Sequence, residues 1–93
     1  MPAYLRELLW DDDNEGHIAH HAVTRTEVEE MCFGDPWVIR AKGRDKRALY
    51  GQTSAGRYLF VILAGRGSGI FYPVTARDMT QTERRRYQDQ RRR

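Results

Sequence analysis

Apolar residues change their spacing at about residue 35 of the 93-residue chain. After an opening run and up to that point they recur at the intervals of a helix, and beyond it they gather in short runs separated by turns. An opening run over Tyr4–Trp10 is typical of a strand, and Asp11 then stands where a helix N-cap is expected. We therefore expect a first strand followed by a helix that reaches about His21.

The second helix has the clearest start signal in the chain. Thr24 and Glu27 have the spacing of a capping box, and Val23 with Val28 has the spacing of a hydrophobic staple. These signals predict a helix that begins at Arg25. It would bury Val28, Met31 and Cys32 and end at Gly34.

The rest of the chain predicts four consecutive strands and a closing helix. The expected strands cover residues 36–40, 47–53, 57–64 and 70–76. The third is almost continuously apolar, which favours a central strand buried on both faces. Pro73 interrupts the fourth and indicates an edge position or a bulge, because proline has no N–H to donate to a ladder. Thr80 and Glu83 repeat the capping-box spacing and begin the last helix.

The predicted order of elements is therefore β-α-α-β-β-β-β-α. Short consecutive strands joined by glycine-containing turns favour a small antiparallel meander, and the helices then flank it. At this length, with no internal repeat and no linker, we expect residues 1–93 to form a single α+β domain.

Charge divides the chain at almost the same point as the apolar pattern. Residues 1–35 hold nine acidic side chains and two arginines, a net charge of −7, whereas residues 36–93 hold fourteen basic and four acidic side chains, a net charge of +10. Fourteen of the sixteen basic residues are arginine, whose planar guanidinium group binds phosphate oxygens in pairs. This asymmetry indicates a basic surface for a polyanion, in the first place RNA; the alternative is a dipolar surface that serves solubility.

Several sequence features bear on the compartment and on cofactors. No apolar run approaches the ~20 residues of a membrane helix. The first residues lack the basic start and apolar stretch of a signal peptide, and a single cysteine cannot form an internal disulfide. We expect a cytoplasmic protein with no membrane segment. His17 and His21 have a helical spacing that can hold a metal, but no further ligand stands nearby, so we expect neither a metal nor a cofactor.

Two arginines stand at the ends of neighbouring expected strands. Arg57 opens the third strand, and Arg77 follows the fourth, just before Asp78. The start of one antiparallel strand lies beside the end of the next, so the two guanidinium groups can meet next to the N-terminus of the last helix. Such a pair would clamp a phosphate. Alternatively, each arginine bonds a turn carbonyl or a local acid such as Asp78.

The last helix and the histidines supply further candidates. The helical spacing places Arg84, Tyr87 and Arg91 on one face. Arginines beside a tyrosine suit single-stranded RNA, whose bases stack on aromatic rings, although Tyr87 packing on the sheet is an equal alternative. The side chains best suited to exchange a proton near neutral pH are His17, His20 and His21.

Short motifs are spread along nearly the whole chain. In the first half they are Leu9-Trp10-Asp11, His21-Ala22-Val23 and Glu27-Val28-Glu29-Glu30. In the second half they are Gly51-Gln52-Thr53, Gly56-Arg57, Val74-Thr75-Ala76-Arg77-Asp78-Met79 and Glu83-Arg84-Arg85-x-Tyr87. Together these motifs resemble the BrnT family, and the last two are the most specific in combination.

The resemblance implies a RelE-like fold, which is a small antiparallel sheet with flanking helices. It also implies the toxin of a type II toxin-antitoxin pair, a ribonuclease that a ribbon-helix-helix antitoxin of the BrnA kind silences in a heteromeric complex. Two departures stand out. Asn14 takes the place of a usual lysine, and the usual lysine-histidine pair appears as His20-His21, one residue closer to the tryptophan.

These observations lead us to expect a metal-independent endoribonuclease that inhibits translation and growth. Arg57 and Arg77 would hold the phosphate. Because Asn14 cannot act as a base, His21 or His20 would move the proton, with Tyr87 in reserve. The expected RNA contacts are Arg84, Arg85, Tyr87 and Trp10. The alternative is a non-catalytic RNA-binding or protein-interaction module of the same fold.

Overall fold

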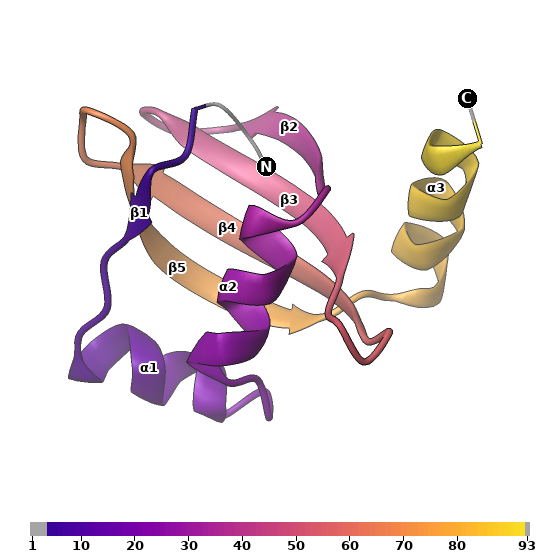
Figure 1. Ribbon diagram of the computed structural model, residues 1–93, viewed down its shortest axis with the longest axis horizontal. Helices are drawn as coiled ribbons and strands as arrows, with labels where there is room; N and C mark the ends of the chain where they lie inside the picture. The colour runs from indigo at the N-terminus through magenta and orange to yellow at the C-terminus, as the bar shows by residue number, and fades with distance from the viewer. Residues whose placement is uncertain (1–3, 93) are drawn as a thin grey trace.

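Within residues 4–92, which the computed structural model describes, five strands form one sheet and three helices surround it (Figure 1). The elements are β1 (Glu7–Leu8), α1 (Asp12–Ala19), α2 (Arg25–Phe33), β2 (Trp37–Ala41), β3 (Lys46–Gln52), β4 (Tyr58–Gly65), β5 (Ile70–Asp78) and α3 (Gln81–Arg91). The expected α+β class and the expected order of elements are confirmed.

The sheet is an antiparallel meander of four strands with a short parallel strand at one edge. β2, β3, β4 and β5 pair in chain order, each antiparallel to the next, and β1 pairs parallel with β5. The strand expected over Tyr4–Trp10 shrinks to two residues. Leu5 and Leu8 are both buried, and their three-residue spacing does not fit the two-residue period of a strand.

A bulge beside Pro73 interrupts β5. Leu63 lies opposite Pro73, but Ile62 lies opposite Thr75, so Val74 is an extra residue on the β5 side. This is one of the two outcomes that the proline predicts. The ladder of hydrogen bonds is interrupted at the proline, which has no N–H to donate to it.

The bulge changes which side chains of β5 face the core. Phe71 before it and Ala76 after it are both buried, although they are five positions apart in the sequence. In an unbroken strand these two side chains would point to opposite faces. Thr75 and Arg77 are thereby turned to the other face of the sheet.

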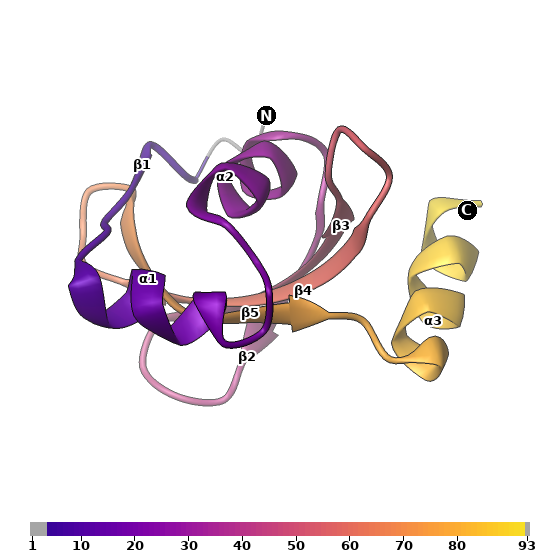
Figure 2. The same cartoon turned by 90° about the horizontal axis from the view of Figure 1, so that it is seen from below.

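The alternation along β4 shows which face of the sheet is covered. Its fully buried residues share one core with α2 and are Leu59, Val61 and Leu63. The residues that alternate with them are only half-buried and are Tyr58, Phe60 and Ile62. β4 is central, as expected, but the expectation that both of its faces are buried is wrong. Figure 2 shows α2 on one face of the sheet, with none of the described helices on the other.

All three helices of the described chain begin with a capping box. Thr24 and Thr80 are the N-caps of α2 and α3, and Asp11 is the N-cap of α1, as the sequence predicts. The capping-box partner of Asp11 is Asn14, a pairing that the sequence reasoning did not include. Gly34 is the C-cap of α2, again as predicted.

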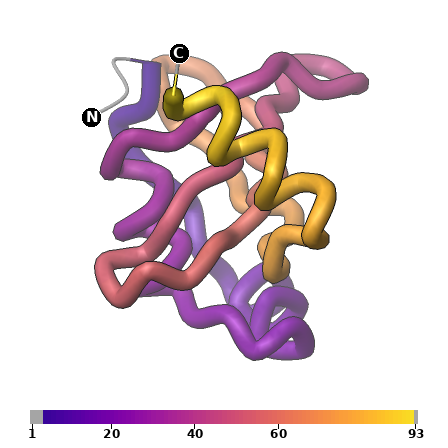
Figure 3. Tube along the Cα trace, turned by 90° about the vertical axis from the view of Figure 1, so that its right-hand side faces the viewer, coloured from indigo at the N-terminus to yellow at the C-terminus, as the bar shows by residue number. Residues whose placement is uncertain are grey.

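α3 stands beyond the end of the sheet at which β3 and β5 finish (Figures 1 and 3). Its buried residue, Tyr87, packs edge-on against the Tyr58 ring, with the ring centres 6.0 Å apart. Near its C-terminal end, Nη1 of Arg91 donates to the Asp35 carbonyl at 3.2 Å. Among the helices described, none is long and apolar enough to cross a membrane.

Candidate nucleic-acid interface

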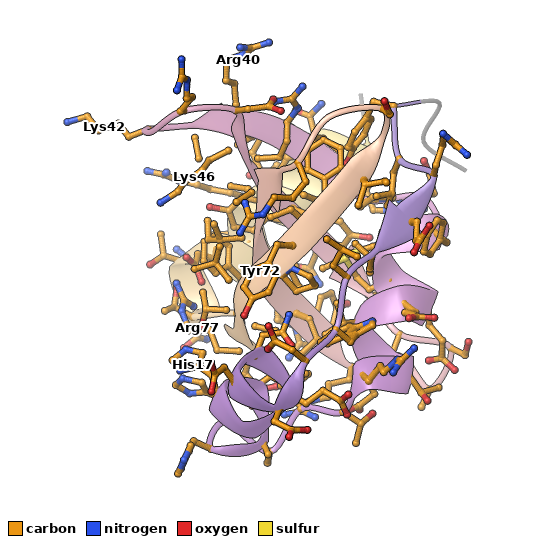
Figure 4. The ribbon with its side chains drawn as sticks, turned by 90° about the vertical axis from the view of Figure 1, so that its left-hand side faces the viewer. His17, Arg40, Lys42, Lys46, Tyr72 and Arg77 are labelled. Atoms are coloured by element: carbon orange, nitrogen blue, oxygen red, sulfur yellow. The ribbon has the colours of Figure 1, made fainter. Side chains whose placement is uncertain are left out.

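The face of the sheet opposite α2, here called the open face, carries aromatic and basic side chains. One row crosses it in register, one residue from each strand of the meander: Trp37, Tyr50, Phe60 and Arg77. Figure 4 shows His17, Lys46 and Arg77 extending from the same side of the molecule. Imidazole, guanidinium and ammonium groups thus share one side of the molecule with aromatic rings.

His17 reaches the open face from α1, which lies beside the β5 edge. Its Nε2 lies 3.0 Å from Oγ1 of Thr75, close enough for a hydrogen bond. Thr75 and Arg77 are two residues apart on one face of β5, which corresponds to about 7 Å along a strand. The His21 ring packs edge-on against the His17 ring, with the centres 5.5 Å apart. The two imidazoles therefore form a pair, and His17 joins it to the face of β5 that carries Arg77.

Contacts on three sides hold Arg77 in place. Its Nη1 and Nη2 donate to the two carboxylate oxygens of Glu83 at 2.8 and 3.0 Å, and Nη1 also donates to the Asp78 carbonyl at 3.0 Å. The guanidinium carbon lies 4.3 Å from the centre of the Phe60 ring. The hydrogen bond with Glu83 raises the pKa of Arg77, and the same bond lowers the pKa of Glu83.

Part of the Arg77 guanidinium remains available. A guanidinium group carries five N–H donors, and the contacts above use three of them. The Nε–H and the second Nη2–H have no acceptor among the described residues. These two donors point to the same side of the group, which is the arrangement that binds two phosphate oxygens at once.

Arg57, by contrast, directs four of its five N–H donors at groups of the protein. Its Nε donates to the Asp78 carboxylate at 2.8 Å, and its Nη1 donates to the Glu27 carboxylate at 3.1 Å. The carbonyls of Ala22 and His21 accept further hydrogen bonds at 2.6 and 3.4 Å. The Asp78 hydrogen bond raises the pKa of Arg57 and lowers the pKa of Asp78. Arg57 thus ties the α1–α2 connection to the sheet.

Arg57 and Arg77 lie at the same end of the sheet, but they do not form one clamp. Both contact Asp78, Arg57 at the carboxylate and Arg77 at the carbonyl, and from there they turn to opposite faces. The expectation of a shared phosphate clamp is therefore corrected. The alternative interpretation, in which each arginine bonds a local acid or a carbonyl, is what the structure shows.

The remaining histidine candidates separate in the structure. His21 contributes its ring to the pair with His17 and its carbonyl to Arg57. His20 is the exposed C-cap residue of α1. Within residues 4–92, no three His, Cys, Asp or Glu side chains are placed to hold a metal ion.

The expected RNA contacts on α3 divide into buried and exposed residues. Tyr87 is 2% exposed and packs on Tyr58, so it cannot stack on a base, and the alternative that it packs on the sheet is confirmed. Arg84 lies over the Tyr58 ring at 4.0 Å. Arg84 and Arg85 line a hollow of about 510 Å³ beside α3, together with Met79, Gln81 and Gln88.

Trp10 lies in an acidic environment. Its Nε1 donates to Glu29 at 2.7 Å, and the Arg25 guanidinium lies over its ring at 5.6 Å. Asn14, which stands where the resemblance has a lysine, is 2% exposed, and its Nδ2 donates to the Leu9 carbonyl at 2.9 Å. Neither side chain reaches the open face, since both belong to the packing around α1 and α2.

The sequence alone does not bring His17 to this face and does not reveal the aromatic row. The histidines that it favours are His20 and His21, because the resemblance points to them. The signal that could have found His17 was Pro73. Carrying its bulge through the alternation of β5 turns Thr75 and Arg77 away from the core, toward the side that α1 can reach.

These features define an α+β protein with a four-stranded antiparallel meander, two helices packed near its start and a basic helix at its end. A solved structure with a similar fold is the crystal structure of the ribonuclease toxin BrnT from Brucella abortus. The match covers 81% of this chain and 97% of that chain, with a TM-score of 0.65 and 20% sequence identity. The chain thus has a BrnT-like fold. Its sequence matches no protein-family model and no curated protein.

Proposed function

We propose that this protein is a metal-independent endoribonuclease and the toxin of a toxin-antitoxin pair. The observation that carries the proposal is the pair of imidazoles, His17 and His21, beside the partly unoccupied guanidinium of Arg77 on the open face. The fold shared with a ribonuclease toxin supports the same reading.

The proposed reaction is a transesterification within RNA. One imidazole takes the proton of a ribose 2′-hydroxyl, and the ribose 2′-oxygen attacks the adjacent phosphorus. The bond from phosphorus to the 5′-oxygen breaks, and the other imidazole, in its protonated form, supplies a proton to that leaving oxygen. The products are a 2′,3′-cyclic phosphate and a 5′-hydroxyl. Arg77 stabilises the charge that builds on the phosphate, and the Thr75 hydroxyl orients the His17 ring.

Cleavage of a labelled single-stranded RNA in the presence of EDTA tests this proposal. His17→Ala and Arg77→Ala should each lower the rate by roughly 100-fold or more, the range expected for a positioned proton donor or anion-binding group. His20→Ala is the matched control and should cleave normally. Loss of wild-type cleavage on chelation, or full activity of both His17→Ala and Arg77→Ala, would overturn the proposed mechanism.

In cells, we propose that the protein cleaves cytoplasmic RNA, inhibits translation and growth, and is neutralised by a ribbon-helix-helix antitoxin. The basic C-terminal half is the part of the chain that an inhibitory partner would cover. Controlled expression should arrest growth, and Arg77→Ala should relieve the arrest at equal protein level. Normal growth with abundant, folded wild-type protein would rule out the toxin role.

A second candidate function is RNA binding without cleavage. The observation that favours it is Asn14, which is buried and bonded where the resemblance has a lysine, so that position supplies no cation. Under this alternative, purified protein binds RNA with a steep salt dependence and leaves it intact.

A further inference from the structure

We propose that the open face binds RNA in single-stranded form, with successive bases stacking along the row Trp37, Tyr50 and Phe60 that leads away from Arg77. This inference rests on the proposed ribonuclease function, because it specifies the form of the RNA and how it lies across the site. It names three side chains that no reaction step requires.

The row is continuous across the sheet. The Trp37 and Tyr50 ring centres are 5.2 Å apart, and those of Tyr50 and Phe60 are 5.0 Å apart. The rings are tilted by 36° and 50°, so neighbours do not cover each other's faces as parallel stacked rings do. All three side chains are half-buried, and their exposed parts lie on the side away from α2. At Phe60 the Arg77 guanidinium lies over the ring at 4.3 Å, so a base bound there stacks on both groups.

Charge complementarity identifies the occupant. Arg77 ends the row on β5, and Arg86 of α3 lies near enough to Tyr50 to act on its phenol electrostatically. Glu83, the acid beside them, is already paired with Arg77. A partner for this surface must offer flat apolar rings together with negative charge. Single-stranded RNA offers both, whereas a duplex keeps the faces of its bases inside the helix.

The dimensions of the row set the length of RNA it can hold. Neighbouring strands are about 4.8 Å apart, so the three steps from Arg77 to Trp37 span about 14 Å. A four-stranded sheet in RNA-recognition domains stacks about two or three bases over a comparable width. At its far end the row reaches a hollow of about 400 Å³ between the start of β2 and the last turn of α3, lined by Trp37, Gln90 and Arg91.

Trp37 makes the test direct, because the chain has only one other tryptophan, Trp10. In a Trp10→Phe protein, the fluorescence of Trp37 reports on the row alone. The probe is a nine-residue 2′-O-methyl oligoadenylate, which cannot be cleaved because it has no 2′-hydroxyl. We expect saturable quenching by this single strand and at least tenfold weaker binding of its duplex with a complementary 2′-O-methyl strand.

Variants of the row complete the test. Tyr50→Leu and Phe60→Leu should each weaken single-strand binding by about 5- to 100-fold, the range for loss of one base–aromatic stack. Leu9→Ala, at an exposed apolar residue outside the row, should bind like the parent. Circular dichroism confirms that each variant is folded.

Three results would overturn the inference. They are equal binding of single strand and duplex, unchanged affinity in both leucine variants, and a Trp37 signal that follows protein concentration instead of RNA, which would indicate a second copy on this face. Because the probe cannot be cleaved, the two proposals fail separately. Binding without any RNA cleavage contradicts only the ribonuclease function, and cleavage without base stacking contradicts only this inference.

Discussion

Replacing Arg57 by methionine separates a structural arginine from a catalytic one. Methionine keeps an unbranched stem but removes the guanidinium group that joins Asp78, Glu27 and the carbonyl of Ala22. Both arginines pair with an acid, so loss of either should lower stability. The geometry predicts that Arg57→Met still cleaves RNA at temperatures where it is folded, whereas Arg77→Ala, on the opposite face, does not.

The magnitude follows from how exposed each partner is. The Asp78 side chain is 64% exposed, so its ion pair with Arg57 contributes at most about 1 kcal/mol after solvent screening. Arg57 and Glu27 are each 26% exposed, and a hydrogen bond between charged groups in such a setting contributes about 1.5 kcal/mol or more. The total is about 2 to 3 kcal/mol, which lowers the melting temperature of a domain of this size by about 10 to 20 °C.

Thermal and urea unfolding followed by circular dichroism measure this loss, with RNA cleavage assayed well below the melting temperature. Arg44→Met, in the exposed β2–β3 turn, is the matched control and should melt like the wild type. We expect Arg57→Met to keep most of its cleavage activity at low temperature. A variant that melts normally but no longer cleaves RNA would refute this reasoning and indicate a catalytic role for Arg57.

The other predictions concern acid stability and the buried amide of α1. Hydrogen bonding to Arg77 holds the pKa of Glu83 below its ordinary value of 4.5, so the stability that this carboxylate contributes is present above that value and is lost as the pH falls through the lower, folded pKa. The free energy of unfolding should therefore fall on acidification below about pH 4.5, and Glu83→Gln should reduce this slope; an unchanged slope would contradict the assignment. Asn14→Lys introduces the lysine that is usual in the family the chain resembles. It should lower the free energy of unfolding in urea by about 2 kcal/mol or more, because it buries a charge and removes the hydrogen bond to the Leu9 carbonyl. A lysine variant as stable as the wild type would contradict this and show that α1 rearranges to expose the new side chain.

The sequence predicted the fold well where local signals and packing agree. The capping boxes at Thr24 and Thr80 each act within a single turn, so residue spacing is enough to locate them. The first strand was predicted too long because its apolar run is buried through Leu5 and Leu8, and only pairing with β5 decides which residues become a strand. The sequence wrongly predicts that both faces of β4 are buried. An apolar residue type does not distinguish a face covered by a helix from a face lined with half-buried aromatic rings.

The candidate site was predicted less completely because it depends on which face each side chain takes. Arg57 and Arg77 were correctly placed at one end of the sheet, yet the nearby carboxylates of Glu27 and Glu83 draw them apart. Glu27 is 30 residues away from Arg57 in the sequence, and Glu83 lies in α3 whereas Arg77 lies in β5. No short sequence motif therefore indicates either pairing. Tyr87 has the composition of a base-stacking residue, but the packing of α3 against Tyr58 buries it.

The bulge in β5 is what connects the fold to the proposed chemistry. With an unbroken strand, Thr75 and Arg77 would share the face of Phe71 and point toward α2, where burial of a charged guanidinium group is costly without a partner. The extra residue, Val74, restores Ala76 to the core and sends Thr75 and Arg77 to the open face. Only there can Arg77 stand beside the aromatic row and within reach of α1. A proline that looks like an interruption of the sheet thus accounts for the position of the groups on which the proposed function depends.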